Sequence, residues 1–194
     1  MSNKLIVLSG FKGSGKDVVG SWLAANRNYK VEAFAYHAAC YVAHTYNIPL
    51  HTLREPGLKE LPLFNRAINP STEAFIPEYL NISSQYFTPR DIVKLEANMK
   101  RVIDLHFWTD IVINQIRLNN TPSVITDWRF MDQIERIKDS LSNYDITTIR
   151  INRFDNPNLN DITEIELNDY SFDLVIDNKG SLEELYEKLE NLYL

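Results

Sequence analysis

The chain has little cysteine, no long apolar run and no excess of positive charge. Its one cysteine, Cys40, excludes an intramolecular disulfide and is compatible with a reducing compartment. No apolar run approaches the roughly 20 residues that span a bilayer, and residues 5–8 are too few for the apolar core of a signal peptide. We therefore expect a cytoplasmic protein without a membrane partner.

Acidic residues outnumber basic ones, 26 to 20, which gives a net charge of −6 and a pI of about 5.2. This balance disfavours a broad duplex-binding surface, because such a surface needs clustered Lys and Arg. A nucleic acid polymer is therefore not an expected partner, whereas a small anionic ligand needs only a few local basic residues. The length of 194 residues and the 44% hydrophobic content suit a single globular domain over residues 1–194.

Glycine is also scarce, yet three of the six glycines stand in one stretch, Gly10-Phe11-Lys12-Gly13-Ser14-Gly15-Lys16-Asp17. An apolar strand precedes this stretch and a helical pattern follows it, which is the context of a phosphate-binding P-loop. The glycines would let the backbone aim its N–H groups at a polyphosphate, and Lys16 could reach the β- and γ-phosphates. The alternative is a Gly-rich turn without a ligand.

The stretch departs from a standard P-loop at Asp17. A standard P-loop has Ser or Thr after the lysine, since that hydroxyl ligates Mg²⁺. A carboxylate could contact Mg²⁺ directly or through water. The other interpretation is that Asp17 only stabilises the start of the helix, where an acid is favourable.

The order of the apolar patterns predicts the fold class. Five strands are expected, at residues 4–9, 31–35, 123–127, 145–151 and 171–176, and helical patterns separate them. This alternation predicts an α/β three-layer sandwich, with a five-stranded parallel sheet and helices on both faces.

Two segments look like insertions at the rim of this sheet. Six of the eight prolines lie between Pro49 and Pro89, so residues 36–87 are a candidate substrate-binding insertion. This segment holds Arg54 and Arg66, which are candidate substrate ligands or ordinary surface charges. The polar segment 152–170 is a candidate lid.

Several charged residues stand at strand ends, where α/β sheets bind ligands. Asp127 and Arg129 follow the third strand; Asp127 could hold Mg²⁺ and Arg129 could pair with a phosphate, or the two could form a local ion pair. Arg150 and Arg153 stand at the end of the fourth strand, at the border of the candidate lid.

Residues 88–91 predict a helix start, because Thr88 can cap, Pro89 suits the first turn and Asp91 completes a capping box. Apolar residues follow at helical spacing. We expect this helix to bury one face against the sheet, with His106 on that face as a packed core histidine.

Three motifs carry a family resemblance. Ser14-Gly15-Lys16-Asp17, Thr126-Asp127-Trp128-Arg129-Phe130 and the stretch from Ile176 to Leu185 resemble bacteriophage deoxynucleoside monophosphate kinases. Phosphomevalonate kinases of the animal type are a more distant match. The resemblance covers both ends and the third strand, is thin between residues 36 and 87, and implies the P-loop nucleoside monophosphate kinase fold.

The resemblance also implies roles for residues. Residues 10–17 would hold the ATP phosphates and Mg²⁺, and Asn178 and Lys179 would lie at the adenine. Asp127 and Arg129 would face the acceptor nucleotide, and Arg90, a further candidate substrate ligand, resembles an arginine that opens the family's third major helix. Trp128 is an aromatic candidate for stacking on the base, with a core position as the alternative. Arg150 and Arg153 would be lid arginines that act with Lys16 and Arg129 in catalysis.

The expected activity is therefore ATP- and Mg²⁺-dependent phosphorylation of a nucleoside monophosphate, in the host cytoplasm if the protein is virus-encoded. A kinase for another small phosphate and a nucleotide-binding regulator without transferase activity are the alternatives. The sequence leaves the oligomeric state open, with a homodimer among the options.

Overall fold

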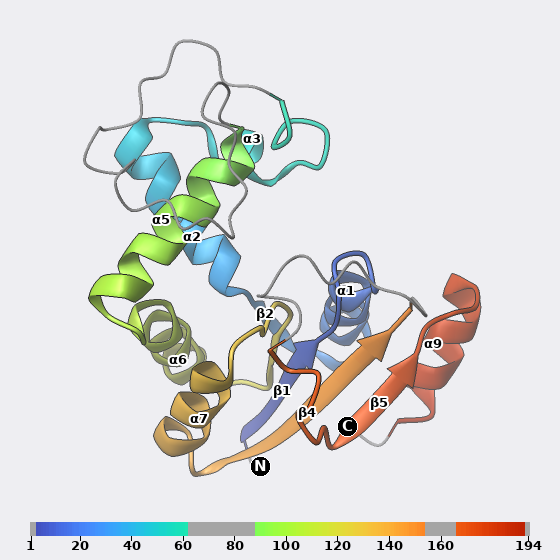
Figure 1. Cartoon of the computed structure of the whole chain (residues 1–194). Coiled ribbons are helices and arrows are strands. Elements are labelled where there is room, and N and C mark those ends of the chain that lie inside the picture. The colour runs from blue at the N-terminus through green and yellow to red at the C-terminus, as the bar shows by residue number, and fades with distance from the viewer. Residues whose placement is uncertain (1–2, 62–87, 154–165, 193–194) are drawn as a thin grey trace. The chain divides into compact units, whose positions relative to one another are not determined.

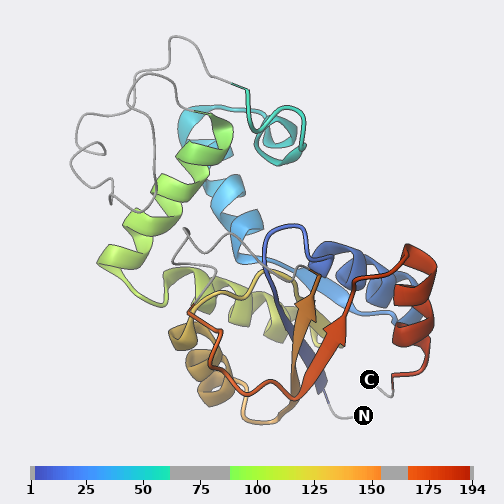
Figure 2. The ribbon, with the colours of Figure 1, turned by 45° about the vertical axis from the view of Figure 1, so that its right-hand side comes forward.

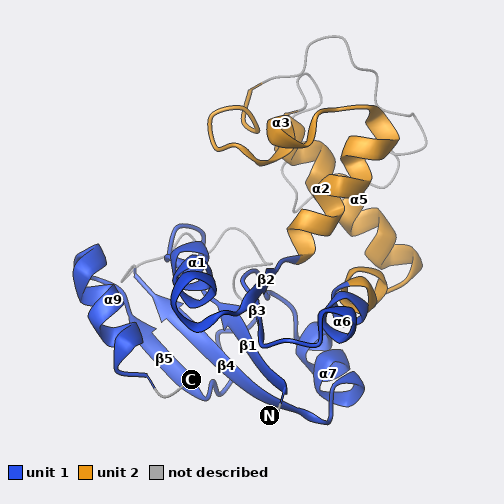
Figure 3. Cartoon of the chain, turned by 180° about the vertical axis from the view of Figure 1, so that it is seen from behind, with its two compact units in different colours: residues 1–33, 112–194 blue, residues 34–111 orange. Residues whose placement is uncertain are grey.

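A computed structural model describes residues 3–61, 88–153 and 166–192 (Figure 1). The chain divides into two compact units, residues 1–33 with 112–194 and residues 34–111 (Figure 3). Within the described ranges, none of the helices combines the length and the apolar character that a transmembrane span requires.

The first unit is built on a five-stranded, fully parallel sheet with the strand order β2-β3-β1-β4-β5. The strands are β1 (Asn3–Ser9), β2 (Lys30–Glu32), β3 (Ser123–Ile125), β4 (Tyr144–Asn152) and β5 (Leu174–Asp177). β1 is the central strand and is buried from Leu5 to Ser9, as expected of a parallel strand that is covered on both faces.

Two helices cover one face of the sheet, α1 (Lys16–Arg27) and α9 (Leu182–Glu190) (Figures 1 and 2). They pack on the alternate strand residues that share this face. That core contains Ile6, Leu8, Val19, Trp22, Leu23, Tyr29, Val124, Ile149, Ile151, Ile176, Leu185 and Leu189. The opposite face carries α7 (Met131–Ser140) and the later part of α6 (Phe107–Asn119). The fold is thus the α/β three-layer sandwich of P-loop proteins, as predicted.

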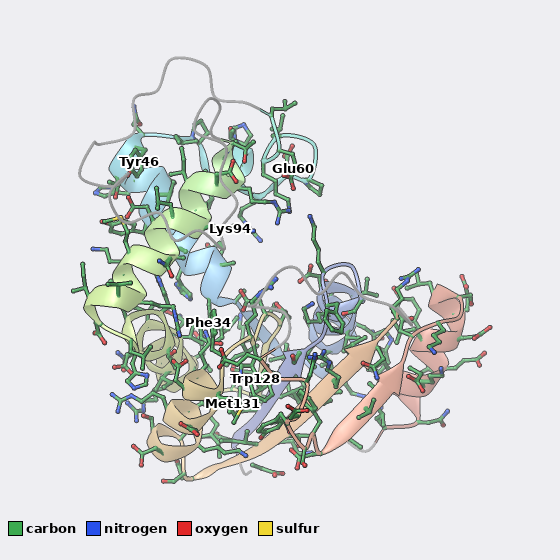
Figure 4. The ribbon with its side chains drawn as sticks, in the orientation of Figure 1. Phe34, Tyr46, Glu60, Lys94, Trp128 and Met131 are labelled. Atoms are coloured by element: carbon green, nitrogen blue, oxygen red, sulfur yellow. The ribbon has the colours of Figure 1, made fainter. Side chains whose placement is uncertain are left out.

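The second unit is helical and contains α2 (Phe34–Tyr46), α3 (Leu50–Arg54) and α5 (Pro89–Ile103). Its apolar core joins these three helices through Ala39, Val42, Ile48, Leu53 and Ile92. The phenol of Tyr46 donates a hydrogen bond to the carboxylate of Glu96, which is buried in α5 (Figure 4).

The predicted capping box at the start of α5 is confirmed. The Thr88 hydroxyl accepts from the Asp91 N–H at 3.2 Å, and the Asp91 carboxylate accepts from the Thr88 N–H at 2.9 Å. The expectation that this helix packs on the sheet is wrong, because α5 packs on α2 and α3. The helix ends at Ile103, so His106 lies beyond it, half-buried.

Three strands have a boundary that differs from expectation by more than one residue. β3 ends at Ile125 and not at residue 127. β2 ends at Glu32 and not at residue 35, since it is an edge strand that pairs only with the three-residue β3, and α2 begins at Phe34. β5 begins at Leu174 and not at residue 171, because residues 170 and 172 turn their rings onto Trp128. Much of both candidate insertions, residues 62–87 and 154–165, lies outside the described residues, so their roles stay predictions.

Candidate phosphate-binding site

The loop after β1 has the backbone of a phosphate cradle. Gly10, Gly13 and Gly15 have φ angles of 150°, 79° and 104°, which L-residues with a side chain rarely adopt. A Cβ atom on Gly10 would lie 2.5 Å from the Ile151 carbonyl oxygen, and one on Gly15 would lie 2.5 Å from Nδ2 of Asn178. Both glycines are therefore required by the path of the loop and by its close neighbours.

Lys16 and the start of α1 supply the positive charge of this loop. The Lys16 ammonium donates to the carbonyl oxygens of Gly10 at 2.5 Å and Phe11 at 2.9 Å, so the side chain lies along the loop. Gly15 is the N-cap of α1 and has no side chain to cap the helix. The first N–H groups of the helix and its positive dipole end therefore face the loop as a site for an anion.

The Ser14 hydroxyl fits the same interpretation. Its Oγ atom is buried and has no hydrogen-bond partner within the described part of the chain. It lies 2.6 Å from the position that a Cβ atom on Gly10 would take. An unpaired buried hydroxyl is costly, and a phosphate oxygen is a suitable acceptor for it.

Asn178, which the resemblance places at the adenine, lies against the P-loop. Its Nδ2 donates to the Ser14 carbonyl oxygen at 2.8 Å, and the residue is 4% exposed. Lys179 and Lys12 are both solvent-exposed. Their roles in binding ATP stay predictions.

Arg150 is a buried residue of β4 and is placed beside the loop by the sheet register. It pairs with Ser9, the last residue of β1, and its guanidinium donates to Ser9 Oγ at 3.1 Å. The guanidinium carbon lies 4.7 Å from the centre of the Phe11 ring and 5.7 Å from that of Phe172, and Nη2 donates to Asn168 at 3.1 Å. Arg150 therefore braces the P-loop through Ser9 and Phe11. Arg153, one residue past the strand, is exposed.

Asp127 reaches the level of the loop. Ile125 pairs with Val7, and the Trp128 N–H donates to the Leu8 carbonyl at 3.2 Å, so Asp127 lies near the end of β1. The residue is half-buried. The residue before Asp127, Thr126, packs tightly against α1, since a Cβ atom on Gly20 would lie 2.5 Å from the Thr126 side chain. This contact places the first turns of α1 close to the end of β3.

Trp128 and Arg129 differ in exposure. Trp128 is 1% exposed, its ring packs edge-on against those of Tyr170 and Phe172, and its Nε1 donates to the Phe130 carbonyl (Figure 4). This position favours a structural role over direct stacking on a substrate. Arg129 is half-buried, and its backbone N–H donates to the side-chain oxygen of Gln133 in the first turn of α7.

The groups at this loop fit a nucleoside triphosphate and its Mg²⁺. The glycine cradle, the Lys16 ammonium and the Ser14 hydroxyl suit phosphate oxygens. Asp17, exposed in the first turn of α1, and Asp127, half-buried after β3, are the carboxylates predicted to hold Mg²⁺. No group of three or more His, Cys, Asp or Glu gathers for a metal within residues 3–61, 88–153 and 166–192. Mg²⁺ commonly takes one or two carboxylates together with phosphates and water, so the pair suffices.

The remaining predicted substrate ligands belong to the helical unit. The Arg54 guanidinium lies 4.8 Å from the centre of the Tyr36 ring, which is 39% exposed. Arg90 forms an ion pair with Glu60 at 2.5 Å. Arg66 lies outside the described residues. The structure thus gathers Gly10 to Asp17, Asp127, Arg150 and Asn178 in one unit and places Arg54 and Arg90 in the other.

Sequence reasoning missed the supporting contacts of the loop. It did not predict that the Arg150 guanidinium contacts Ser9, Phe11 and Phe172. Only the register of β1 with β4 could have shown this, because it sets Arg150 opposite Ser9.

Comparisons with known proteins add little. No family model matches the chain, and no curated protein matches its sequence. A gluconokinase from Sinorhizobium meliloti is 13% identical with a TM-score of 0.46, over 99% of this chain and 97% of that one. A sugar kinase from Janibacter is 10% identical with a TM-score of 0.47, over 96% and 92%. The APS kinase of Mycobacterium tuberculosis is 10% identical with a TM-score of 0.42, over 98% and 96%. Likenesses this weak carry no argument, so the interpretation of the site rests on its own geometry.

Proposed function

We propose that this chain is an ATP-dependent kinase that transfers the γ-phosphoryl group to a nucleoside monophosphate, with a deoxynucleotide as the expected acceptor. The observation that carries the proposal is the P-loop itself. Three glycines with positive φ, the Lys16 ammonium and the uncapped start of α1 converge on one loop at the end of the central strand. The family resemblance of the sequence motifs supports the choice of acceptor.

The reaction would break the bond between the γ-phosphorus and the bridging oxygen and form a bond to an acceptor phosphate oxygen. That oxygen is already an anion, so no general base is needed. The protein then contributes positioning and charge neutralisation. Lys16 would neutralise charge on the β- and γ-phosphates, and Arg129 and Arg153 would neutralise charge on the acceptor and on the group in transfer.

When bound, Mg²⁺ would neutralise negative charge on the phosphates of ATP. Asp17 and Asp127 are the residues that would hold it, directly or through water. Arg150 would keep the Phe11 side of the loop in place.

The test is ADP formation by the purified chain with Mg²⁺ and a panel of monophosphates: the deoxynucleotides, the ribonucleotides and phosphomevalonate. We expect stimulation by at least one deoxynucleoside monophosphate, among which dTMP, dGMP or a modified dCMP are favoured by the resemblance. The control is Lys16→Met, which keeps a long side chain but loses the charge.

Each other result identifies a rival. Stimulation by phosphomevalonate alone would show a kinase for another small phosphate. ATP binding without ADP formation for any acceptor would show a nucleotide-binding regulator. Either result would contradict the proposed acceptor.

A further inference from the structure

The side chain of Asn178 lies where it can set the direction of a P-loop peptide group. Its Nδ2 donates to the Ser14 carbonyl oxygen at 2.8 Å. Only the amide nitrogen can make this bond, because the partner is a carbonyl and accepts. In a trans peptide the C=O of one residue and the N–H of the next point in opposite directions. A Ser14 carbonyl held toward Asn178 therefore turns the Gly15 N–H away from Asn178.

Asn178 is itself held firmly. Its backbone N–H donates to the Asn152 carbonyl at 2.6 Å, which continues the pairing of β4 with β5. The carbonyl of the preceding residue, Asp177, accepts from the Lys188 ammonium of α9 at 2.6 Å. Two strands and a helix thus fix the residue, which is 4% exposed, so water has little access to take over its hydrogen bond.

Gly15 completes this arrangement. A Cβ atom on Gly15 would lie 2.5 Å from Nδ2 of Asn178, so the amide reaches the Ser14 carbonyl only because Gly15 has no side chain. With a φ angle of 104°, Gly15 also has a backbone that is flexible without an external restraint. The hydrogen bond from Asn178 is such a restraint.

We propose that Asn178 is a positioning residue of the phosphate site. It holds the Ser14–Gly15 peptide so that the Gly15 N–H is preorganised as a donor to a phosphate oxygen. This differs from the adenine contact expected from the resemblance. The proposal rests on the proposed function only in that the loop binds a polyphosphate, and it makes no use of the acceptor.

The test compares ATP with inorganic tripolyphosphate, which has the phosphates but no base. Binding of each to wild type, Asn178→Ala and Asn178→Asp is measured by calorimetry with Mg²⁺ present. We expect Asn178→Ala to weaken both ligands alike, by about tenfold, as for one lost hydrogen bond of about 1.4 kcal/mol. Asn178→Asp keeps the shape but cannot donate, and we expect a larger loss for both ligands.

The matched control is Asn26→Ala. Asn26 makes the same kind of bond, from Nδ2 to the Trp22 carbonyl at 2.9 Å, near the other end of α1. We expect its removal to leave both affinities unchanged. Urea unfolding of all variants separates a loss of stability from a loss of binding, and Asn178→Asp supplies the measurement if Asn178→Ala does not fold.

Three results would overturn the proposal. Weaker ATP binding with unchanged tripolyphosphate binding would show a contact to the base. Lower stability with both affinities unchanged would show a purely structural hydrogen bond. A wild-type chain that binds no tripolyphosphate would remove the phosphate site. A negative acceptor panel together with the expected tripolyphosphate result would overturn only the proposed kinase activity.

Discussion

Asp17 is the residue that departs most from a standard P-loop, and its exposed position in the first turn of α1 keeps two roles open. A carboxylate beside phosphates is repelled, but a bound Mg²⁺ reverses that sign because the ion is the largest local charge. We predict that Asp17 contacts the metal. Asp17→Asn should then weaken Mg-ATP binding and leave metal-free ATP binding equal or stronger. Calorimetry with Mg²⁺ and with a chelator measures both affinities; equal changes in the two would identify Asp17 as a helix cap only.

The effects of replacing Arg150 and Arg153 should differ, because Arg150 is buried and Arg153 is exposed. Arg150 is 7% exposed and braced by Ser9 and Phe11, so Arg150→Ala should lower both the free energy of unfolding, by about 2–4 kcal/mol, and the activity. Arg153 is exposed, so Arg153→Ala should lower kcat, on the order of 10³-fold for an arginine that stabilises the transferring group, and leave stability unchanged.

Arg129→Ala provides the comparison, since we expect it to raise the KM for the acceptor more than it lowers kcat. Steady-state kinetics and urea unfolding of the three variants give all the values. Wild-type kinetics in all three would remove these arginines from the site, and an Arg150→Ala variant of wild-type stability would contradict its bracing role.

At the residue scale, the P-loop could be predicted from the sequence, whereas the side chains that contact and hold it could not. Glycine spacing and Lys16 are local signals, because backbone freedom and charge are properties of the residues themselves. The contacts of Arg150 and Asn178 join residues 141 and 164 positions apart, and only the strand register brings them together. The burial of Trp128 likewise depends on Tyr170 and Phe172, which lie far along the chain.

At the scale of elements, a pH-dependent contact joins β4 to Asp173, the residue that precedes β5. The Asp173 carboxylate accepts from the Thr148 N–H at 2.8 Å and from the Thr148 hydroxyl at 2.6 Å. These hydrogen bonds hold the pKa of Asp173 below its ordinary value, with the Lys138 charge adding to the effect. The contact therefore stabilises the fold above the ordinary pKa of an aspartate and is lost as the pH falls through the lowered value.

We predict that Asp173→Asn destabilises the chain at pH 7 and that its deficit relative to wild type shrinks as the pH falls below about 4. Urea unfolding between pH 7 and pH 3 measures this, with Asp139→Asn on the exposed surface of α7 as the control. A deficit that stays constant over that range would show that the carboxylate charge is not what stabilises this contact.

Element types were largely predictable, and their ends were not. The capping box of α5 was recognised from Thr88, Pro89 and Asp91 because its hydrogen bonds are local. The partner of the same helix was predicted wrongly, since an apolar face indicates burial without saying against what. β2 stopped early because the three-residue β3 gives it nothing further to pair with.

For the whole molecule, the residues predicted to bind ATP all lie in one unit, and those predicted to bind the acceptor are divided between the two. The P-loop, Arg150 and Asn178 belong to the unit that carries the sheet, and Arg54 and Arg90 belong to the helical unit.

A bound ligand stabilises the unit that binds it by mass action, by about 2.7 kcal/mol at 100 times its Kd, and so protects the amides of that unit from hydrogen exchange. We predict that a non-hydrolysable ATP analogue slows hydrogen exchange in the sheet unit, at residues 10–19 and 176–178 above all. An acceptor monophosphate should slow exchange at residues 88–92 and around Arg54, as well as at residues 127–129. Exchange mass spectrometry with each ligand alone measures both patterns, and Lys16→Met is the control that should lose the first and keep the second. Protection by the monophosphate confined to the sheet unit would remove Arg54 and Arg90 from the acceptor site and leave the P-loop assignment standing.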